Sequence, residues 1–170
     1  WTPRLLAPGL LGGAQGAIGW WMVASGLTGE MTSVVSYRLA IHLGLAFAIL
    51  GLITWYVLSL RREEADLLRA RRQRNRGLMG WGTALVAVAF AQVLLGALVA
   101  GIDAGRAYPE WPLMAGAIIP PGAFDLQPLW RNFFDNPGLA QFNHRMAGYL
   151  LLLLIVLAFC RARASALSSL

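Results

Sequence analysis

The chain has 170 residues, of which 58% are hydrophobic and 13% charged, with a mean hydropathy of +0.59 and a formal net charge of +6. This composition is too apolar for an ordinary water-soluble domain and indicates a membrane protein. The positive charge does not indicate nucleic-acid binding, because half of the arginines fall in residues 61–76, a short segment between apolar stretches with three acidic residues interleaved. That pattern is typical of a solvated loop.

Four segments are apolar for long enough to cross about 30 Å of hydrocarbon, which requires roughly 20 helical residues. They are residues 5–29, 39–60, 77–102 and 142–160, the last counted with its polar start. None shows the strict alternation of polar and apolar residues that marks a membrane β-barrel strand. We therefore predict an all-α integral membrane protein with four transmembrane helices in this chain.

Arginine accounts for every basic residue, and its distribution predicts the orientation. If the four spans alternate, ten arginines lie at one end of the protein. The other end keeps four, which are Arg38, Arg106, Arg131 and Arg145. The positive-inside bias places the arginine-rich end, with the loop 61–76, on the cytoplasmic side of a bacterial inner membrane or the matrix side of a mitochondrial one.

The spans repeat as two helix pairs in the same orientation. Span 5–29 contains Gln15 followed four residues later by Gly19, and span 77–102 contains Gln92 followed by Gly96. Each is followed by an outer loop and then by a span with one histidine near its outer end. We therefore divide the chain into residues 1–76 and 77–170, each a helix pair, related as a parallel repeat about an axis along the membrane normal.

The two outer loops differ in length. The first, residues 28–38, is short, whereas the second, residues 103–141, holds six of the eight prolines. Within it, residues 124–136 carry apolar side chains at helical spacing: Leu126, Leu129, Trp130, Phe133 and Phe134. Such a segment is expected to lie in the membrane interface with its aromatic face down, as a cap on whatever lies below.

The two histidines, His42 and His144, are the candidate functional residues, because polar groups at membrane depth are costly. A histidine bonded to a loop carbonyl or a lipid headgroup is the simpler alternative. Arg38 lies one helical turn outside His42, and Arg145 follows His144. An axial imidazole in the helices and a cation at the interface are what a haem and its propionates require, so haem is the leading ligand.

Other ligands and roles fit less well. Zinc would require three or four clustered ligands, which the spans do not offer at ligand spacing. Proton relay by a histidine remains open. Gly44 and Gly148 lie two and four residues beyond the histidines and could leave room for a flat ligand, although small residues also serve helix packing. Cys160 is the single cysteine, so no disulfide forms within the chain.

Four stretches resemble the haem A synthase family, in its form without outer-loop cysteines. They are GWWMVASGL (19–27), SYRLAIHLG (36–44), GALVAGIDAGRAYPEWPLM (96–114) and LWRNFFDNPGLAQFNHRMAGY (129–149). The resemblance implies a protein of eight transmembrane helices in two pseudo-symmetric four-helix halves, with a histidine pair in each half. This chain would then cover the third to sixth helices.

The resemblance also assigns roles to the two histidines. His42 matches the second histidine of the amino-terminal half, which is thought to face the substrate, haem O, and so counts as the catalytic candidate. His144 matches the first histidine of the carboxy-terminal half, which is thought to ligate a haem b cofactor. Arg38, Arg145, Gly44 and Gly148 are then expected around the two haems, each histidine being an axial iron ligand. The partner histidines and a functionally important glutamate of complete members are not in these 170 residues, and Asp103, Arg106 and Tyr108 receive no role.

The reaction that the resemblance implies is oxidation of a methyl group of haem O to the formyl group of haem A, by successive hydroxylation and loss of water. Haem O synthase and cytochrome oxidase assembly factors are the implied partners, together with the lipid bilayer, and a homo-oligomer is left open. The residues agree in that they offer no Ser-His-Asp arrangement and no phosphate-binding glycine loop.

Two other functions remain open at the level of sequence. In a b-type cytochrome subunit, His42 and His144 would ligate a single haem for electron transfer. In a structural or assembly subunit without a cofactor, both histidines would be interfacial.

Overall fold

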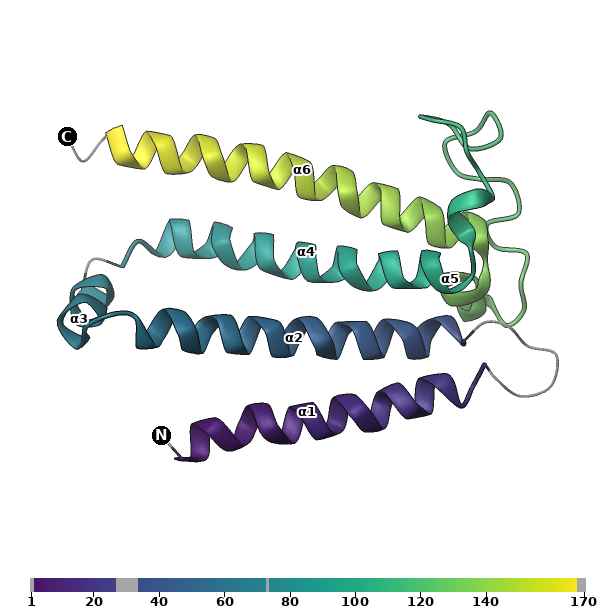
Figure 1. The fold of residues 1–170 in the computed structure, drawn as a ribbon. Coiled ribbons are helices and arrows are strands. Elements are labelled where there is room, and N and C mark those ends of the chain that lie inside the picture. The colour runs from purple at the N-terminus through teal and green to yellow at the C-terminus, as the bar shows by residue number, and fades with distance from the viewer. Residues whose placement is uncertain (1, 27–33, 73, 168–170) are drawn as a thin grey trace.

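The computed structural model describes residues 2–26, 34–72 and 74–167, and the described residues form helices and loops without a strand. Four long helices lie side by side: α1 (Thr2–Val23), α2 (Ser36–Leu60), α4 (Arg76–Gly101) and α6 (Pro137–Leu167) (Figure 1). Leucine- and alanine-rich segments of this length satisfy all their backbone hydrogen bonds internally only as helices. The predicted all-α class is confirmed.

The four helices form an open row. α1 packs on α2, α2 on α4, and α4 on α6, so that α4 lies between α2 and α6 (Figure 1). The α2–α4 contact is built from small residues and leucine, with Ala40, Ala97 and Leu98 buried. Both flanks of the row expose large apolar side chains, for example Trp20 at 76% and Leu152 at 62%. Such a surface suits lipid or further helices, not water.

The predicted spans agree with the helices to different extents. α2 and α4 begin and end within three residues of the predictions 39–60 and 77–102, whereas α6 extends the prediction 142–160 by several residues at both ends. α2, α4 and α6 are long and apolar enough to cross a membrane, and the protein is an integral membrane protein. α1 is a 22-residue helix that is not among these three; it ends before residue 29, and residues 27–29 lie outside the described part.

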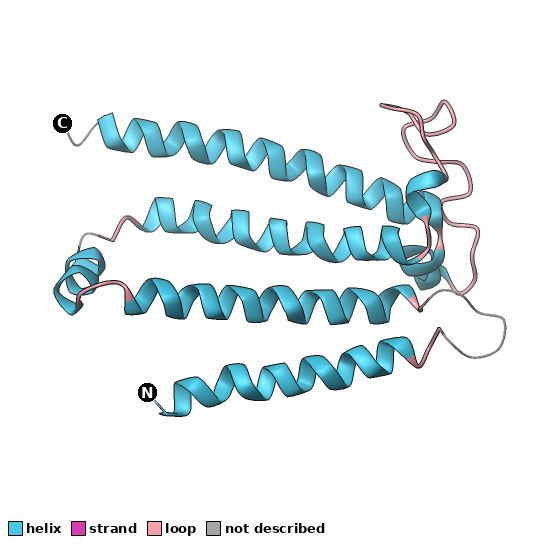
Figure 2. Cartoon of the chain, in the orientation of Figure 1, coloured by secondary structure: helices cyan, strands magenta, loops and turns pink. Residues whose placement is uncertain are grey.

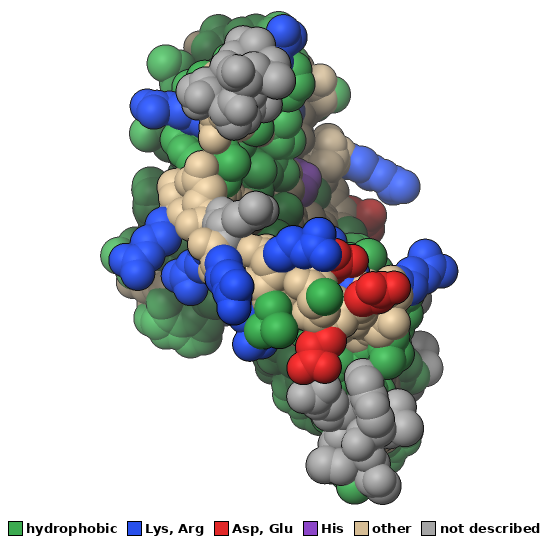
Figure 3. All heavy atoms as spheres, turned by 90° about the vertical axis from the view of Figure 1, so that its left-hand side faces the viewer, with side chains coloured by type: hydrophobic (Ala, Val, Ile, Leu, Met, Phe, Trp, Pro, Cys, Tyr) green, Lys and Arg blue, Asp and Glu red, His purple; other side chains and the backbone are tan. Residues whose placement is uncertain are grey.

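The arginine-rich segment 61–76 contains a short helix that the sequence analysis did not predict. α3 (Glu64–Arg72) has acidic residues in its first turn and arginines in its last turn, which suits the helix dipole. It buries no residue. Positively charged side chains gather around α3 and the neighbouring helix ends on this face of the molecule (Figure 3). The segment is therefore a solvated, basic surface, as its composition predicts.

The long outer loop is mostly irregular (Figure 2) and holds its shape through two buried asparagines. The Asn132 side chain donates to the carbonyls of Leu126 and Leu129 and accepts from the Leu126 amide, at 2.9–3.0 Å. Asn136 donates to the Gly122 carbonyl at 2.7 Å and to Asn132 Oδ1 at 3.2 Å. The predicted interfacial helix is reduced to a 3₁₀ turn, η2 (Leu129–Arg131), and the four-residue α5 (Asn132–Asp135). A further turn, η1 (Ala104–Arg106), follows α4.

Candidate functional site

His42 lies on α2, and its imidazole packs against α1. A Cβ placed on Gly19 would lie 2.9 Å from His42 Cε1, so this position has no room for a side chain. One turn away, Gln15 Nε2 lies 3.4 Å from His42 Nε2 and donates to the His42 carbonyl at 3.1 Å. We call Gln15, Gly19 and His42 the first Gln–Gly–His site.

His144, on α6, has the same surroundings on α4. A Cβ on Gly96 would lie 3.1 Å from His144 Cε1, and Gln92 Nε2 lies 3.4 Å from His144 Nε2. Gln92, Gly96 and His144 form the second Gln–Gly–His site. The Gln-x-x-x-Gly spacing that the sequence repeats therefore has a structural purpose, which is to place an amide and a gap against the imidazole of the next span.

The two sites also share their unsatisfied polar atoms. His42 Nδ1 and Gln15 Oε1 are buried and make no hydrogen bond within the described residues, and the same is true of His144 Nδ1 and Gln92 Oε1. A buried polar atom without a partner costs about 1–3 kcal/mol, so four in matched positions call for an explanation. A ligand or a further segment that completes both sites would provide one.

The arginines beside the histidines contact different parts of the outer end of the protein, Arg38 the end of α1 and Arg145 the long outer loop. Arg38 Nη1 donates to the Trp21 carbonyl at 2.8 Å, and its guanidinium lies 4.3 Å from the centre of the Trp21 ring. Arg145 Nη2 donates to the Tyr108 carbonyl at 2.7 Å. In each arginine one buried nitrogen, Arg38 Nε or Arg145 Nη1, has no partner among the described residues. Arg38 thus ties α2 to the end of α1, Arg145 anchors the long outer loop, and each keeps one nitrogen without a partner in the part of the chain that the structure describes.

The two glycines beyond the histidines contact protein side chains. A Cβ on Gly44 would lie 2.7 Å from a Leu94 methyl carbon, so Gly44 allows α2 to approach α4. A Cβ on Gly148 would lie 3.2 Å from Gln92 Nε2. Gly148 therefore makes room for the amide that contacts His144, which places it next to the second Gln–Gly–His site, whereas Gly44 serves the helix interface.

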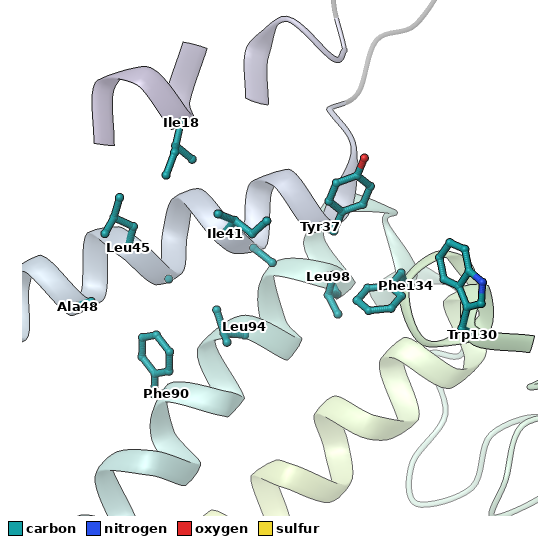
Figure 4. Close-up of a pocket in the computed structure, with 12 residues that line it drawn as sticks. Ile18, Tyr37, Ile41, Leu45, Ala48, Phe90, Leu94, Leu98, Trp130 and Phe134 are labelled. Atoms are coloured by element: carbon teal, nitrogen blue, oxygen red, sulfur yellow. The ribbon is translucent and has the colours of Figure 1, made fainter. Parts of the chain in front are cut away.

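Two apolar cavities lie on different faces of α2. One, of about 510 Å³, is lined by α2, by Gln92 and Gly96 of α4, and by His144. The other, of about 890 Å³, is lined by Ile41, Gly44 and neighbouring residues of α1, α2 and α4 (Figure 4). Trp130 and Phe134 of the long outer loop lie at one end of this second cavity (Figure 4). The aromatic segment thus covers a cavity, as predicted, although as a short turn.

An apolar cavity lies beside His144, whereas neither of the two apolar cavities is lined by His42. A haem needs a neutral imidazole held by a second group, an apolar cavity beside it and cations near its propionates. His144 has a glutamine amide and an apolar cavity beside it, with Arg145 next in the chain, and the 510 Å³ volume of the cavity lies within the usual range of ligand pockets, about 300–1,000 Å³. A metal ion bound by protein side chains fits less well, since the described residues include no group of three or more His, Cys, Asp or Glu.

The structure separates the two histidines. His42 contacts α1 and His144 contacts α4, and α4 lies between α2 and α6. A single haem held by both imidazoles would require the two helices to face each other. The arrangement therefore favours two independent sites over the single-haem electron carrier.

Sequence reasoning missed several residues of these sites. Gln15 and Gln92 appeared only as marks of the repeat, and their contacts with the histidines emerge from helix packing. Tyr108, which had no assigned role, accepts hydrogen bonds through its carbonyl from both Arg145 and Gln141, the latter at 2.9 Å. Asp103 adopts a left-handed conformation at φ 52°, which lets the chain turn after α4.

Comparison with known proteins gives a consistent result. The family model COX15-CtaA, described as cytochrome oxidase assembly protein, matches residues 1–169. Proteins named heme A synthase are 64% identical over 168 residues in Ruegeria sp. (strain TM1040) and 66% identical over 165 residues in Paracoccus denitrificans (strain Pd 1222). These matches cover 98% and 97% of this chain but 44% and 43% of the relatives, so the chain spans less than half of their length. No solved structure matches the chain.

Proposed function

The chain belongs to the COX15-CtaA family of cytochrome oxidase assembly proteins, and from this we propose that it is the part of a haem A synthase that carries one axial histidine from each of two haem sites. The observation that carries the proposal is the duplicated Gln–Gly–His site, in which the same two contacts with the imidazole recur on separate helix pairs. Two sites in one chain suit an enzyme that must hold a haem substrate and a second haem at the same time.

In this proposal the two sites have different ligands. His42 binds the substrate haem O, and His144 binds a haem b cofactor. When bound, the cofactor supplies electron transfer for the oxidation of a methyl group of haem O to the formyl group of haem A. The protein orients the two rings: each imidazole is fixed by a neighbouring helix, and each is accompanied by an arginine with an unpaired nitrogen, which suits a propionate.

The cavity beside His144 gives the cofactor site its character. Its apolar lining from α2 and α4 excludes water from the face of the ring. Gly148 and Gly96 keep the space around the imidazole and the Gln92 amide free of side-chain carbon. Gly44 belongs to the contact between the helix pairs, so it affects haem through the packing of α2 and α4.

The wider assignments follow from the same reading. Residues 1–76 complete the amino-terminal half and residues 77–170 begin the carboxy-terminal half, and α3 lies on the cytoplasmic or matrix side of the inner membrane. Partners would include haem O synthase and cytochrome oxidase assembly factors, and a homo-oligomer is compatible with the apolar flanks of the helix row.

Haem extraction tests the proposal. Membranes that make haem O are prepared with and without the intact protein containing this chain, and their haems are separated by chromatography. We expect haem A with the intact protein and none after replacement of His42 or His144. Bound haem b with unchanged haem O would instead assign the protein to electron transfer and overturn the synthase function.

A further inference from the structure

We propose that Gln15 and Gln92 are positioning residues that favour, in His42 and His144, the tautomer with the lone pair on Nε2 and the proton on Nδ1. This inference rests on the proposed function only in assigning haem iron as the ligand. The contacts that carry it are those of the side-chain amides of Gln15 and Gln92.

The polarity of the contact decides the tautomer. The Gln15 Nε2 atom donates to the His42 carbonyl, which can only accept, so this end of the amide is the NH₂ group. The same nitrogen lies 3.4 Å from His42 Nε2. An amide NH₂ has no lone pair to offer, and therefore His42 Nε2 must be the acceptor and the ring proton must be on Nδ1. Gln92 Nε2 lies 3.4 Å from His144 Nε2, and since no second contact among the described residues orients this amide, we assign His144 the same tautomer from the match between the two sites.

This tautomer is the one that can ligate iron. An imidazole that binds a metal through Nε2 needs its lone pair there and its proton on Nδ1, and the group that fixes this arrangement also orients the ring. The contact is long for a hydrogen bond, beyond the usual 2.7–3.2 Å, so a ligand can displace it at little cost. The glutamine thus keeps Nε2 ready and gives way when a stronger partner arrives.

The unsatisfied atoms fit this role. In the tautomer that the glutamine selects, Nδ1 is a donor, and it is buried and unpaired in both histidines within the described residues. The Oε1 atom of each glutamine is an unpaired acceptor in the same site. If a metal were bound at Nε2, the glutamine Oε1 would be an acceptor available to the Nδ1–H, and such a hydrogen bond is the usual support of a metal-bound histidine.

The glycine in each site restricts the alternative positions of the ring. At Gly19 and at Gly96 the edge of the imidazole lies against the backbone of the neighbouring helix. A methyl group at either glycine would lie 2.9 or 3.1 Å from Cε1 of the ring, which is too close without some movement. The ring is therefore held on one edge by the glycine and at Nε2 by the amide. Close packing fixes its position, and the amide fixes the placement of its proton.

The test uses the intact protein that contains this chain, with Gln15→Met, Gln92→Met and both together. Methionine has the length of glutamine and fills its space but makes no comparable hydrogen bond. Gln127→Met, which replaces an exposed glutamine of the outer loop, is the matched control. Nitrogen NMR of the haem-depleted, ¹⁵N-histidine-labelled protein reports the tautomer, and titration with haemin reports the affinity of the sites.

We expect His144 in the unmodified protein to show an unprotonated Nε2, and Gln92→Met to lose that signature while Gln127→Met keeps it. Haemin affinity at the His144 site should fall about 10- to 100-fold in Gln92→Met, the usual effect of removing a group that supports a metal ligand. Gln15→Met should change the His42 signals and leave those of His144 unchanged.

Two results would overturn the inference. One is a protonated Nε2 in the unmodified protein, and the other is an unchanged tautomer and unchanged affinity in Gln92→Met, which would reduce the glutamine to a space-filling role. The NMR readout needs no haem, so it judges the glutamines even if the protein proves not to make haem A. If the protein makes haem A and the Gln→Met variants keep both the tautomer and the haemin affinity, the inference is wrong while the proposed function stands.

Discussion

The two helix pairs are alike at the imidazole and different at the outer end. In both, a glutamine amide lies 3.4 Å from Nε2 of the histidine and a glycine lies against the ring. Above the ring they diverge: Arg38 stacks on Trp21 at the end of α1, whereas Arg145 holds the long loop through the Tyr108 carbonyl. The two pairs therefore share the glutamine and glycine that hold the imidazole, and they differ in the contacts of the arginine at the outer end.

This difference has a physical reason. The imidazole is positioned by contact between two helices, and that geometry repeats wherever the same residues face each other at the same spacing. The outer closure differs in kind, because it is a contact between α2 and α1 in the first pair and a contact between α6 and the long loop in the second. A pair of sites with equal supports and unequal covers can hold chemically similar rings in different environments, as a substrate and a cofactor require.

The largest expected effect comes from the ligands themselves. Under the proposed function, His42→Leu and His144→Leu should each abolish haem A formation, but only His144→Leu should remove from the purified protein the haem b that the proposal assigns to its site. Haem content by optical spectroscopy, together with chromatography of extracted haems, separates the two. Loss of the same haem in both variants would contradict independent sites and restore the single-haem electron carrier. Gln127→Met is again the control, because its side chain is exposed.

The second effect comes from filling the gap beside the ring. Gly19→Ala places a Cβ 2.9 Å from His42 and Gly96→Ala places one 3.1 Å from His144, so the first demands the larger displacement. Overpacking of this kind costs about 1–3 kcal/mol. We expect weaker haem binding at the site next to each variant, with the greater loss for Gly19→Ala, measured by haemin titration.

Other glycines of the same helices provide matched controls for this comparison. A Cβ on Gly16 of α1 or Gly82 of α4 would meet no atom within 4 Å. Alanine there should stabilise the helix by up to about 1 kcal/mol and leave haem binding unchanged. Equal losses of haem in Gly16→Ala and Gly19→Ala would mean that helix flexibility, not the space beside the imidazole, governs the site.

The sequence predicts the parts that depend on composition and period. The helices, the inner arginine-rich end and the repeat all follow from uninterrupted apolar segments and from the recurrence of Gln-x-x-x-Gly before a histidine-bearing span. The contact of Gln92 with His144 could have been proposed from that recurrence, since a glutamine inside an apolar helix needs a polar partner. It was missed because the sequence does not state which helix faces which.

Other features lay beyond what the sequence could specify. α3 forms because charges in its first and last turns suit the helix dipole, a weak local signal within a segment that reads as solvated loop. Gly44 lies near a histidine in sequence, yet it points to Leu94, because its position on α2 differs from that of His42 by about 200° of helical rotation. Proximity along a helix is therefore a poor guide to which residues share a site.

A third, smaller effect should follow from the arginine of the second pair. Arg145→Met removes the hydrogen bond to the Tyr108 carbonyl, which is also held by Gln141. The remaining bond limits the loss to about 1 kcal/mol, in the range of a single hydrogen bond at a partly exposed site. Hydrogen exchange of the loop around Tyr108 should quicken while exchange in α1 stays unchanged. Equal quickening in both helix pairs would contradict separate closures.

The smallest effect concerns the stacking that distinguishes the first pair. Trp21→Leu removes the aromatic ring beneath Arg38 but keeps the backbone carbonyl that accepts its hydrogen bond at 2.8 Å. An exposed cation–π contact contributes about 0.5–1 kcal/mol, so thermal unfolding in detergent should shift only slightly. In a double-mutant cycle with Arg38→Met, the coupling energy should equal that small term. Because this contact belongs to the first helix pair alone, the Trp21→Leu variant should retain haem at His144. Loss of that haem would show that the outer ends of the two pairs depend on each other. Such a result would contradict the separation of α2 from α6 by α4.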